Sequence, residues 1–213
     1  MTQGQRIFVT GTGTEVGKTF CTVALMAELV ERGHSVAAHK PAQSFEPADL
    51  GTTDAEQLAK ASGQSPQEIC PTHRWYDVAL APPMAAESTN RQPATMHDYL
   101  GEFRWTTATY AFVEGAGGLR SPIASDGDCL DLARALNPDL YIVVAHCELG
   151  VIHSVISTCE PLDPTKVVVW LNWFDETNDL HLRNRAWLGD RAPFPLVTDA
   201  AQMASRLESE IPR

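Results

Sequence analysis

The glycine-rich segment Gly11–Thr19, which reads Gly-Thr-Gly-Thr-Glu-Val-Gly-Lys-Thr, constrains the fold more than any other part of the chain. It follows an apolar run that predicts a strand over Arg6–Thr10, and it leads into a helical pattern over Gly17–Arg32. Glycines let the backbone N–H groups of such a turn approach an anion, and the helix N-terminus adds its dipole. The segment therefore predicts a strand–loop–helix unit that binds a nucleoside triphosphate.

Two side chains of this loop suit phosphate chemistry. Lys18 can place its ammonium among the β- and γ-phosphate oxygens, and the Thr19 hydroxyl can ligate Mg²⁺. The general pattern has glycine at position 12, whereas this chain has Thr12, and Gly11 lies one residue early. A glycine-rich turn with a surface lysine would not explain the strand and helix on either side. We therefore interpret the loop as an ATPase-type phosphate site.

Strand and helix patterns alternate along the rest of the chain. Nearly continuous apolar runs, typical of strands covered on both faces, predict strands over Ser35–His39, Ala111–Val113, Leu140–Ala145 and Lys166–Leu171. Helical patterns cover Asp54–Ala61, Met96–Thr107, Asp128–Ala135, Gly150–Thr158, Leu180–Leu188 and Asp199–Glu208. The alternation implies parallel pairing with right-handed crossovers. We expect an α/β fold of the P-loop NTPase type, with a mostly parallel sheet, helices on both faces, and a single domain over 1–213.

Two local features refine this prediction. In the first helix, Val23, Ala27 and Val30 lie on one face, and Gly33 is expected to end the helix. The segment Cys70–Pro93 contains several prolines and has poor periodicity, so it predicts a long irregular connection. Such a connection is either functional or a surface excursion without chemistry.

Composition argues against several classes of protein. The chain has 16 Lys and Arg against 27 Asp and Glu, a net charge of −11, which disfavours nucleic acid or an anionic membrane as the main partner. Its 5 cysteines lack CxxC spacing, which fits reduced thiols better than disulfides or a zinc site. The N-terminus does not read as a secretory signal, and no apolar run approaches the ~18–20 residues of a membrane span. We expect a soluble, cytoplasmic protein.

Charged side chains follow the predicted strands at the edge where open parallel sheets bind ligands. The second strand is followed by Lys40 and Ser44, and the third ends at Glu114. Together with Thr19, the carboxylates of Asp54 and Glu114 can complete the coordination of Mg²⁺. Asp54 taken alone could instead cap a helix, and Lys40 could be either an exposed strand-end lysine or a site for a second anion.

The other residues that often serve as ligands give weaker signals. The histidines lack metal-ligand spacing, so surface or core positions are expected for His34, His73, His97, His146, His153 and His181. The 5 tryptophans are more typical of a core than of a cofactor platform.

Four segments, taken together, resemble the dethiobiotin synthetase family. They read FVTGTGTEVGKT, HKPAQS, VEGAGGL and, later, a Leu-Gly-Val-Ile run from Leu149. Their order and spacing match the family, and the resemblance extends to about Ile156. The early glycine of the loop, Gly11, is also typical of the family. The resemblance implies a P-loop α/β homodimer that closes a cyclic urea from 7,8-diaminononanoate and CO₂ or bicarbonate, consuming MgATP. A carbamate and a carbamic–phosphoric anhydride would be its intermediates.

The resemblance also implies a role for each matched residue. Lys18, Lys40 and Ser44 would act in catalysis, with Lys40 beside the carbamate and Ser44 touching the diamine or its carbamate. Thr19, Asp54 and Glu114 would ligate Mg²⁺. ATP would be held by Gly13, Thr14, Glu15, Val16, Gly17, Lys18, Thr19, Phe20, Asp54, Glu114, Gly115, Ala116 and Gly117.

The chain departs from the family pattern in two places. The segment Leu149–His153 has histidine where the family has asparagine; Gly150, Val151, Ile152 and His153 would contact the substrate carboxylate of the neighbouring subunit. On the base side, Asn172 lies where the family often has an asparagine, but Trp173 and Phe174 differ from the usual surroundings. Pro195, Leu196 and Val197 resemble the late strand end that flanks the base.

Two other functions are compatible with a phosphate loop. A ParA- or MinD-like ATPase switch usually carries a lysine early in the loop, where this chain has Gly13. A relative that amidates a cofactor precursor normally needs a glutaminase domain with a nucleophilic cysteine, for which 213 residues leave little room.

Overall fold

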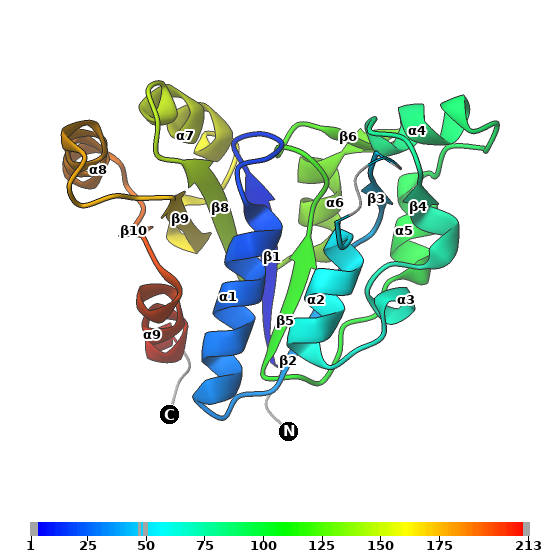
Figure 1. The fold of residues 1–213 in the computed structure, drawn as a ribbon, viewed down its shortest axis with the longest axis horizontal. Helices are drawn as coiled ribbons and strands as arrows, with labels where there is room; N and C mark the ends of the chain where they lie inside the picture. Colours follow the sequence, from blue (N-terminus) through cyan, green and yellow to red (C-terminus); the bar gives the residue numbers. More distant parts are fainter. Residues whose placement is uncertain (1–3, 47, 49–50, 211–213) are drawn as a thin grey trace.

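The computed structural model describes residues 4–46, 48 and 51–210, and these form an α/β fold around a parallel sheet (Figure 1). Over the described residues, the main sheet has six strands in the order β10-β9-β8-β1-β5-β2, and every neighbouring pair is parallel. The bounds of the strands in chain order are β1 Gln5–Gly11, β2 Val36–His39, β5 Tyr110–Glu114, β8 Leu140–His146, β9 Val167–Asn172 and β10 Leu196–Val197. All strands that the apolar runs predict are confirmed.

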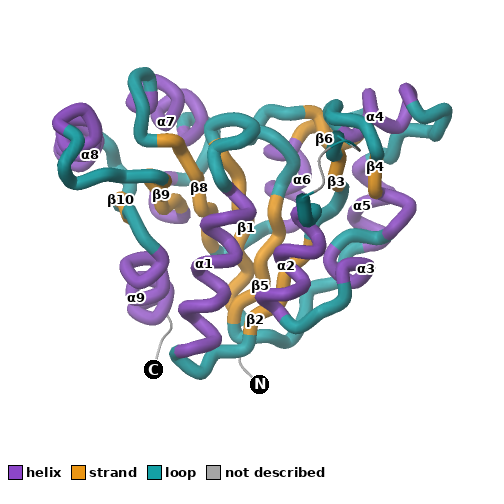
Figure 2. Tube along the Cα trace, in the orientation of Figure 1, coloured by secondary structure: helices purple, strands orange, loops and turns teal. Residues whose placement is uncertain are grey.

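Helices cover both faces of this sheet, as its apolar strands require (Figure 2). One face carries α1 (Lys18–Glu31), α2 (Asp54–Ser62) and α9 (Ala200–Glu210), and the other carries α6 (Cys129–Leu136), α7 (Val151–Cys159) and α8 (Asp179–Arg191). Alternate residues of β1 point into the two cores: Ile7 and Val9 pack with α1 and α9, whereas Phe8 packs with α6 and α7. The predicted layer arrangement is therefore confirmed.

The buried face of α1 differs from the one marked by Val23, Ala27 and Val30. Val30 is 50% exposed, while the buried side chains are those of Lys18, Cys21, Thr22, Leu25, Met26 and Leu29. Apolar residues occur all round this helix, so spacing alone does not select the face that meets the sheet. The predicted helix end is confirmed, because Gly33 follows the last turn with a φ of 86°.

The segment Cys70–Pro93 is more ordered than its prolines predict, because it contains the short 3₁₀ helix η1 (Thr72–Arg74), β4 (Trp75–Tyr76) and α4 (Pro82–Ser88). Around it, the connection between β2 and β5 also contains β3 (Gln43–Ser44), α3 (Pro66–Ile69) and α5 (Met96–Glu102). Pro82 and Pro83 begin α4, where a missing N–H does no harm. The predicted Met96–Thr107 helix is too long, because the backbone becomes extended at Phe103.

Smaller elements complete the fold. The strands β3 and β4 pair in parallel, and β6 (Pro122–Ala124) pairs antiparallel with β7 (Gly127–Asp128). A second 3₁₀ helix, η2 (Pro164–Lys166), precedes β9. The 5 cysteines are all free and buried, and no helix among the described residues is both long and apolar enough to cross a membrane.

Candidate active site

The phosphate loop lies where β1 ends and α1 begins, at the upper edge of the sheet in Figure 1. Glu15 and Gly17 adopt left-handed backbone angles, with φ of 56° and 88°, and these bend the chain into a cradle. The Lys18 side chain folds back over the loop and donates a hydrogen bond to the Gly13 carbonyl at 3.1 Å. Burial lowers the pKa of Lys18, although the Glu114 carboxylate opposes this effect. The loop thus presents an ammonium above a turn of backbone, which is the arrangement that a phosphate chain needs.

Asn172, at the end of β9, contacts this loop through a hydrogen bond. Its side-chain Nδ2 donates to the Val16 carbonyl at 3.0 Å, and the residue is 3% exposed. A Cβ on Gly17 would overlap the Asn172 amide, so the loop can approach β9 closely only because position 17 is glycine. Asn172 was expected beside the nucleotide base. Its side-chain nitrogen instead donates its hydrogen bond to the phosphate loop.

Glu114 connects the loop to the neighbouring strands. It ends β5 beside Val9 of β1, and only 1% of it is exposed. Its Oε1 accepts from the Thr19 hydroxyl at 2.7 Å and from Lys40 Nζ at 2.8 Å, and Oε2 lies 3.1 Å from the Thr22 hydroxyl. These partners compensate the cost of burying the carboxylate.

Lys40 lies between two carboxylates. Its Nζ is 2.7 Å from Asp54 Oδ2 as well as 2.8 Å from Glu114 Oε1, and its side chain is 4% exposed. Burial alone would lower the pKa of Lys40, but the two carboxylates outweigh it and raise the pKa. Burial would likewise raise the pKa of Asp54, but Lys40 outweighs it and lowers the pKa. Lys40 is thus part of the phosphate-loop site and is not an exposed strand-end lysine.

The helix-cap interpretation of Asp54 is wrong, because Thr53 occupies the cap of α2. The Thr53 hydroxyl accepts from the Glu56 N–H, and the Glu56 carboxylate accepts from the Thr53 N–H in return. The Asp54 side chain is therefore directed to Lys40 and to the Thr19 hydroxyl.

The predicted metal ligands are close together. The Thr19 hydroxyl donates to Glu114 at 2.7 Å and also helps to lower the pKa of the nearby Asp54 carboxyl, so one hydroxyl and two carboxylates gather beside the phosphate loop. Within the described part of the chain, no group of three or more His, Cys, Asp or Glu side chains could hold a metal by itself. One or two carboxylates suffice for Mg²⁺ when phosphate oxygens and water supply the other ligands, so these residues fit that ion.

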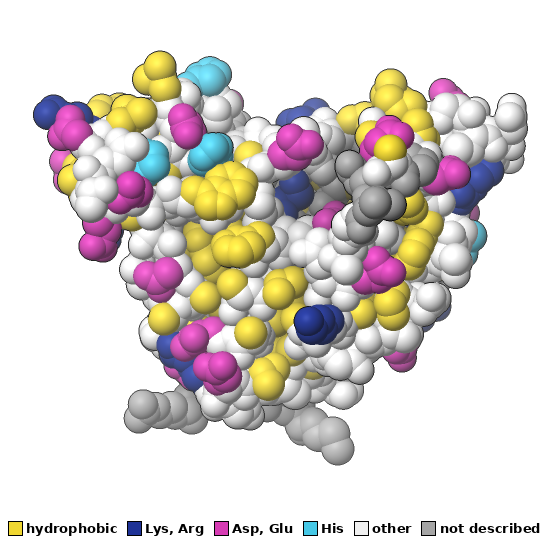
Figure 3. Space-filling model, in the orientation of Figure 1, with side chains coloured by type: hydrophobic (Ala, Val, Ile, Leu, Met, Phe, Trp, Pro, Cys, Tyr) yellow, Lys and Arg dark blue, Asp and Glu magenta, His cyan; other side chains and the backbone are white. Residues whose placement is uncertain are grey.

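A cavity of about 490 Å³ lies next to this charged cluster. Its lining includes Ser44 from β3 and Asp54 from α2, together with Gln43, Phe45, Gly51, Thr52 and Thr53. The Gln43 carboxamide oxygen accepts from the Ala55 N–H at 3.0 Å and so ties β3 to the start of α2. The volume is in the range of small-molecule sites. Figure 3 shows the molecular surface hollowed at the upper centre, with charged side chains in the hollow.

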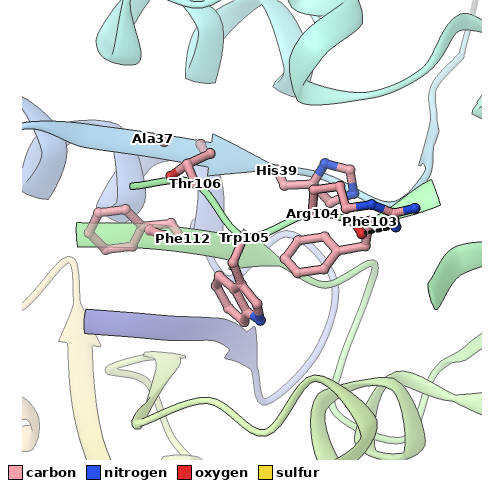
Figure 4. Close-up of a pocket in the computed structure, with 9 residues that line it drawn as sticks. Ala37, His39, Phe103, Arg104, Trp105, Thr106 and Phe112 are labelled. Carbon is pink, nitrogen blue, oxygen red and sulfur yellow. Dashed lines mark hydrogen bonds between the residues drawn. The ribbon is translucent and has the colours of Figure 1, made fainter. Parts of the chain in front are cut away.

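A second pocket lies on the edge strand β2 and involves none of the predicted site residues among those that line it (Figure 4). His39, Phe103 and Trp105 line it, and its volume of about 10 Å³ has room for about one water. The His39 ring meets Phe103 edge-on, with centroids 4.9 Å apart. This pocket is too small to bind a substrate.

Comparison with known proteins identifies the family. A family model described as an AAA domain matches residues 5–171. The ATP-dependent dethiobiotin synthetase of Rhodopirellula baltica is 31% identical, over 94% of this chain and 85% of its own length. That of Pseudomonas paraeruginosa is also 31% identical, over 92% of this chain and 90% of its own. The chain belongs to the dethiobiotin synthetase family. It is an ATP-dependent enzyme, as the phosphate loop predicts.

A solved structure of more distant sequence confirms the fold class. A plasmid partition protein from Borrelia burgdorferi superposes with a TM-score of 0.58, covering 99% of this chain and 100% of its own, at 10% sequence identity. At that identity the similarity concerns the fold alone. It therefore confirms the P-loop NTPase fold and does not favour a partition-type switch over a dethiobiotin synthetase.

The second glycine-rich motif of the dethiobiotin synthetase pattern packs directly against the phosphate loop. A Cβ on Gly118 would lie 3.4 Å from Gly13 Cα, and the Leu119 N–H donates to the Gly11 carbonyl at 3.3 Å. Gly117 has a φ of 68°. The predicted nucleotide-binding run Gly115–Gly117 therefore leads directly into Gly118 and Leu119, which lie against the cradle.

The segments expected to contact the substrate carboxylate of a neighbouring subunit lie elsewhere. Gly150 caps α7 after β8, which pairs with β1 on the side opposite β5, so α7 lies across the loop from Lys40 (Figure 1). Val151 is buried, and its N–H already donates to the Glu148 carbonyl. His153 is exposed. One chain does not bring Gly150–His153 together with its own Ser44.

The predicted base-flanking run from Pro195 forms the end of the sheet. Leu196 and Val197 are β10, which pairs with β9, and the Pro195 carbonyl accepts from the Val169 N–H. Val197 is buried in the core with α9. This strand therefore lies beside Asn172, on the side of the loop away from Lys40.

Sequence reasoning missed Thr22 as a member of the site. It is 2% exposed and its hydroxyl lies against Glu114. Its position three residues after Thr19 puts both hydroxyls on one side of a helix, and this spacing was the available signal.

Proposed function

We propose that the protein forms dethiobiotin from 7,8-diaminononanoate, CO₂ and ATP by closing a cyclic urea. The observation that carries this proposal is the Lys40–Glu114 contact of 2.8 Å, which places a second ammonium beside the phosphate loop. A simple nucleotide hydrolase needs one phosphate lysine. Two ammonium groups suit a reaction in which a triphosphate meets another anion.

The reaction joins two negatively charged partners. One substrate amine takes up CO₂ as a carbamate, and a carbamate oxygen then accepts the γ-phosphoryl group from ATP, releasing ADP. The second amine attacks the carbamoyl carbon of this anhydride, the C–N bond forms, and the C–O bond to phosphate breaks. Lys18 would hold the phosphates and Lys40 would lie beside the carbamate, so that their charges offset the repulsion.

Positioning explains most of the catalysis in this proposal. The substrate amines are themselves nucleophiles, so no nucleophilic side chain is needed. Thr19, Asp54 and Glu114 would hold Mg²⁺, which when bound neutralises part of the phosphate charge. The 490 Å³ cavity would accept the diamine, with the Ser44 hydroxyl hydrogen-bonded to an amine or to the carbamate.

The position of α7 supports a homodimer in this proposal. Leu149 is 85% exposed and Ile156 40% exposed, and they flank the segment Gly150–His153. The helix N-terminus at Gly150 offers backbone amides to a carboxylate of the partner's substrate, and His153 can donate a hydrogen bond. A cytoplasmic location and a single domain over 1–213 complete the proposal.

The test is an omission assay with the purified protein. Phosphate release is measured with MgATP, bicarbonate and diaminononanoate, leaving out one component at a time, and the cyclic urea is detected by mass. We expect phosphate and dethiobiotin in equal amounts, and neither when any component is missing. Phosphate release that is independent of the diamine would contradict the proposal.

A further inference from the structure

Trp173 stands out among the aromatic side chains near the phosphate loop. It follows Asn172 directly at the end of β9, and it is 48% exposed. Its indole ring lies 3.5 Å from the point where a Cβ on Gly17 would stand. A large aromatic side chain that is half exposed beside a phosphate-binding loop is available to a ligand that binds there.

The surroundings hold Trp173 in place. Its φ of 52° is unfavourable for a residue with a side chain, and such angles persist where the neighbouring structure imposes them. The Asn172–Val16 hydrogen bond ties the preceding residue to the loop, and the His146 ring meets the indole edge-on with centroids 4.5 Å apart. Trp173 therefore offers an aromatic surface held in place beside the phosphate loop.

The arrangement of charges indicates which end of a nucleotide comes near this surface. Lys40, Asp54 and Glu114 gather on the β5 and β2 side of the loop, where the γ-phosphate would meet the second anion of the proposed reaction. The nucleoside of a triphosphate bound in this way would extend to the opposite side, toward β8 and β9. Trp173 lies on that side. Figure 3 shows exposed hydrophobic side chains there, above α1 and beside histidine side chains.

We propose that the Trp173 indole stacks on the base of the nucleotide and supplies much of its base affinity. The inference rests on nucleotide binding at the loop, as the proposed function does. Stacking uses the π-face, which every purine has, so Trp173 would strengthen ATP and GTP binding alike. It would act on affinity and leave the rate of the bound complex unchanged.

Calorimetric titrations with ATP, GTP and inorganic tripolyphosphate test this inference. For Trp173→Ala we expect dissociation constants about tenfold higher for ATP and GTP, and an unchanged constant for tripolyphosphate, which has no base. Trp173→Phe keeps an aromatic face and should restore most of the affinity. Trp187→Ala is the matched control, because Trp187 on α8 is 38% exposed, and it should bind as the wild type does.

Turnover measurements add a second readout. In Trp173→Ala the KM for ATP should rise while kcat at saturating ATP stays unchanged. Unaltered ATP affinity in this variant would overturn the stacking role, and so would equal weakening of tripolyphosphate binding, which would mean that the loop itself had been disturbed. If the wild type bound neither ATP nor tripolyphosphate, the proposed function would fail as well.

Discussion

The Lys40 ammonium lies 2.8 Å from the Oε1 atom of Glu114, and both side chains are almost completely buried. The contact joins the ends of β2 and β5, which are neighbours in the sheet. Through the Thr19 hydroxyl, which donates to the same oxygen, it also joins the phosphate loop. One carboxylate thus fixes the second lysine relative to the phosphate loop.

Replacing Lys40 should abolish ring closure while nucleotide binding is largely kept. Lys40→Ala removes the ammonium next to the carbamate, and we expect turnover to fall by about 100-fold or more. It also leaves Glu114 buried without its charged partner, so the free energy of unfolding should drop by about 3 kcal/mol. Dethiobiotin formation, ATP titration and urea unfolding measure the three effects.

Two further variants separate catalysis from stability. In the double variant Lys40→Ala with Glu114→Gln, the unpaired charge is gone, so part of the stability should return without any turnover. Lys60→Ala removes an exposed lysine on α2 and should change neither quantity. Near-normal turnover in Lys40→Ala would remove this residue from the reaction.

Replacing Lys18 should affect an earlier step. Lys18→Ala removes the ammonium above the phosphate loop, so we expect weaker binding of ATP together with lost turnover. Titration with ATP checks this, and an unchanged dissociation constant would contradict the assignment of the loop.

The Glu114 carboxylate should set the response to Mg²⁺. We expect Glu114→Gln to lower activity and to raise the Mg²⁺ concentration needed for half-maximal turnover, since a neutral amide is a poorer ligand for this ion. A chelator should abolish wild-type turnover. Glu31→Gln, an exposed change at the far end of α1, is the control. An identical metal response in Glu114→Gln would count against a ligand role.

Any side chain at position 17 should weaken the protein, because a Cβ there would overlap Asn172. A second glycine with nearly the same φ separates this overlap from the cost of the left-handed backbone. Gly17→Ala forces a left-handed residue to carry a Cβ that overlaps the Asn172 amide, so both ATP affinity and stability should fall. Gly33→Ala has nearly the same φ, 86°, but no described atom lies within 4 Å of its Cβ. It should cost only about 1 kcal/mol of stability and leave ATP binding intact. Equal effects of the two changes would mean that the Asn172 contact is unimportant.

His39 should make the protein sensitive to mild acid. Burial lowers the pKa of His39 to about 4, whereas the unfolded side chain has a pKa of about 6.5. Between these values the unfolded state binds a proton that the folded state does not, so stability falls as the pH drops from about 6.5 to about 4. Urea unfolding of the wild type and of His39→Gln should show this loss only in the wild type. A constant difference between the two proteins over this range would be inconsistent with a buried neutral imidazole.

Sequence patterns predicted five of the six described strands of the main sheet, the sheet class and the phosphate loop, because each depends on short-range periodicity or on one local motif. They did not predict which face of α1 is buried, since Val30 and Leu29 are both apolar and only tertiary packing distinguishes them. The α4 helix was missed because its prolines read as breakers, although they stand at its start.

In the candidate site, too, local sequence rules predicted some features and tertiary packing determined the others. The association of Lys40 and Glu114 followed from the rule that ligands bind at the carboxyl ends of parallel strands. The support of the loop by Asn172, the contact of Thr22 with Glu114 and the exposed position of Trp173 depend on long-range packing, which a single sequence does not reveal.

The central claim is that the loop and Lys40 bring a triphosphate to a carbamate, and isotope transfer tests it most directly. In a single turnover started with freshly added ¹⁸O-labelled bicarbonate, MgATP and diaminononanoate, the released phosphate is analysed by mass. Because the anhydride breaks at its carbamoyl C–O bond, the account predicts that an oxygen atom from the labelled bicarbonate appears in the phosphate. Phosphate that carries oxygen only from ATP and water would contradict it.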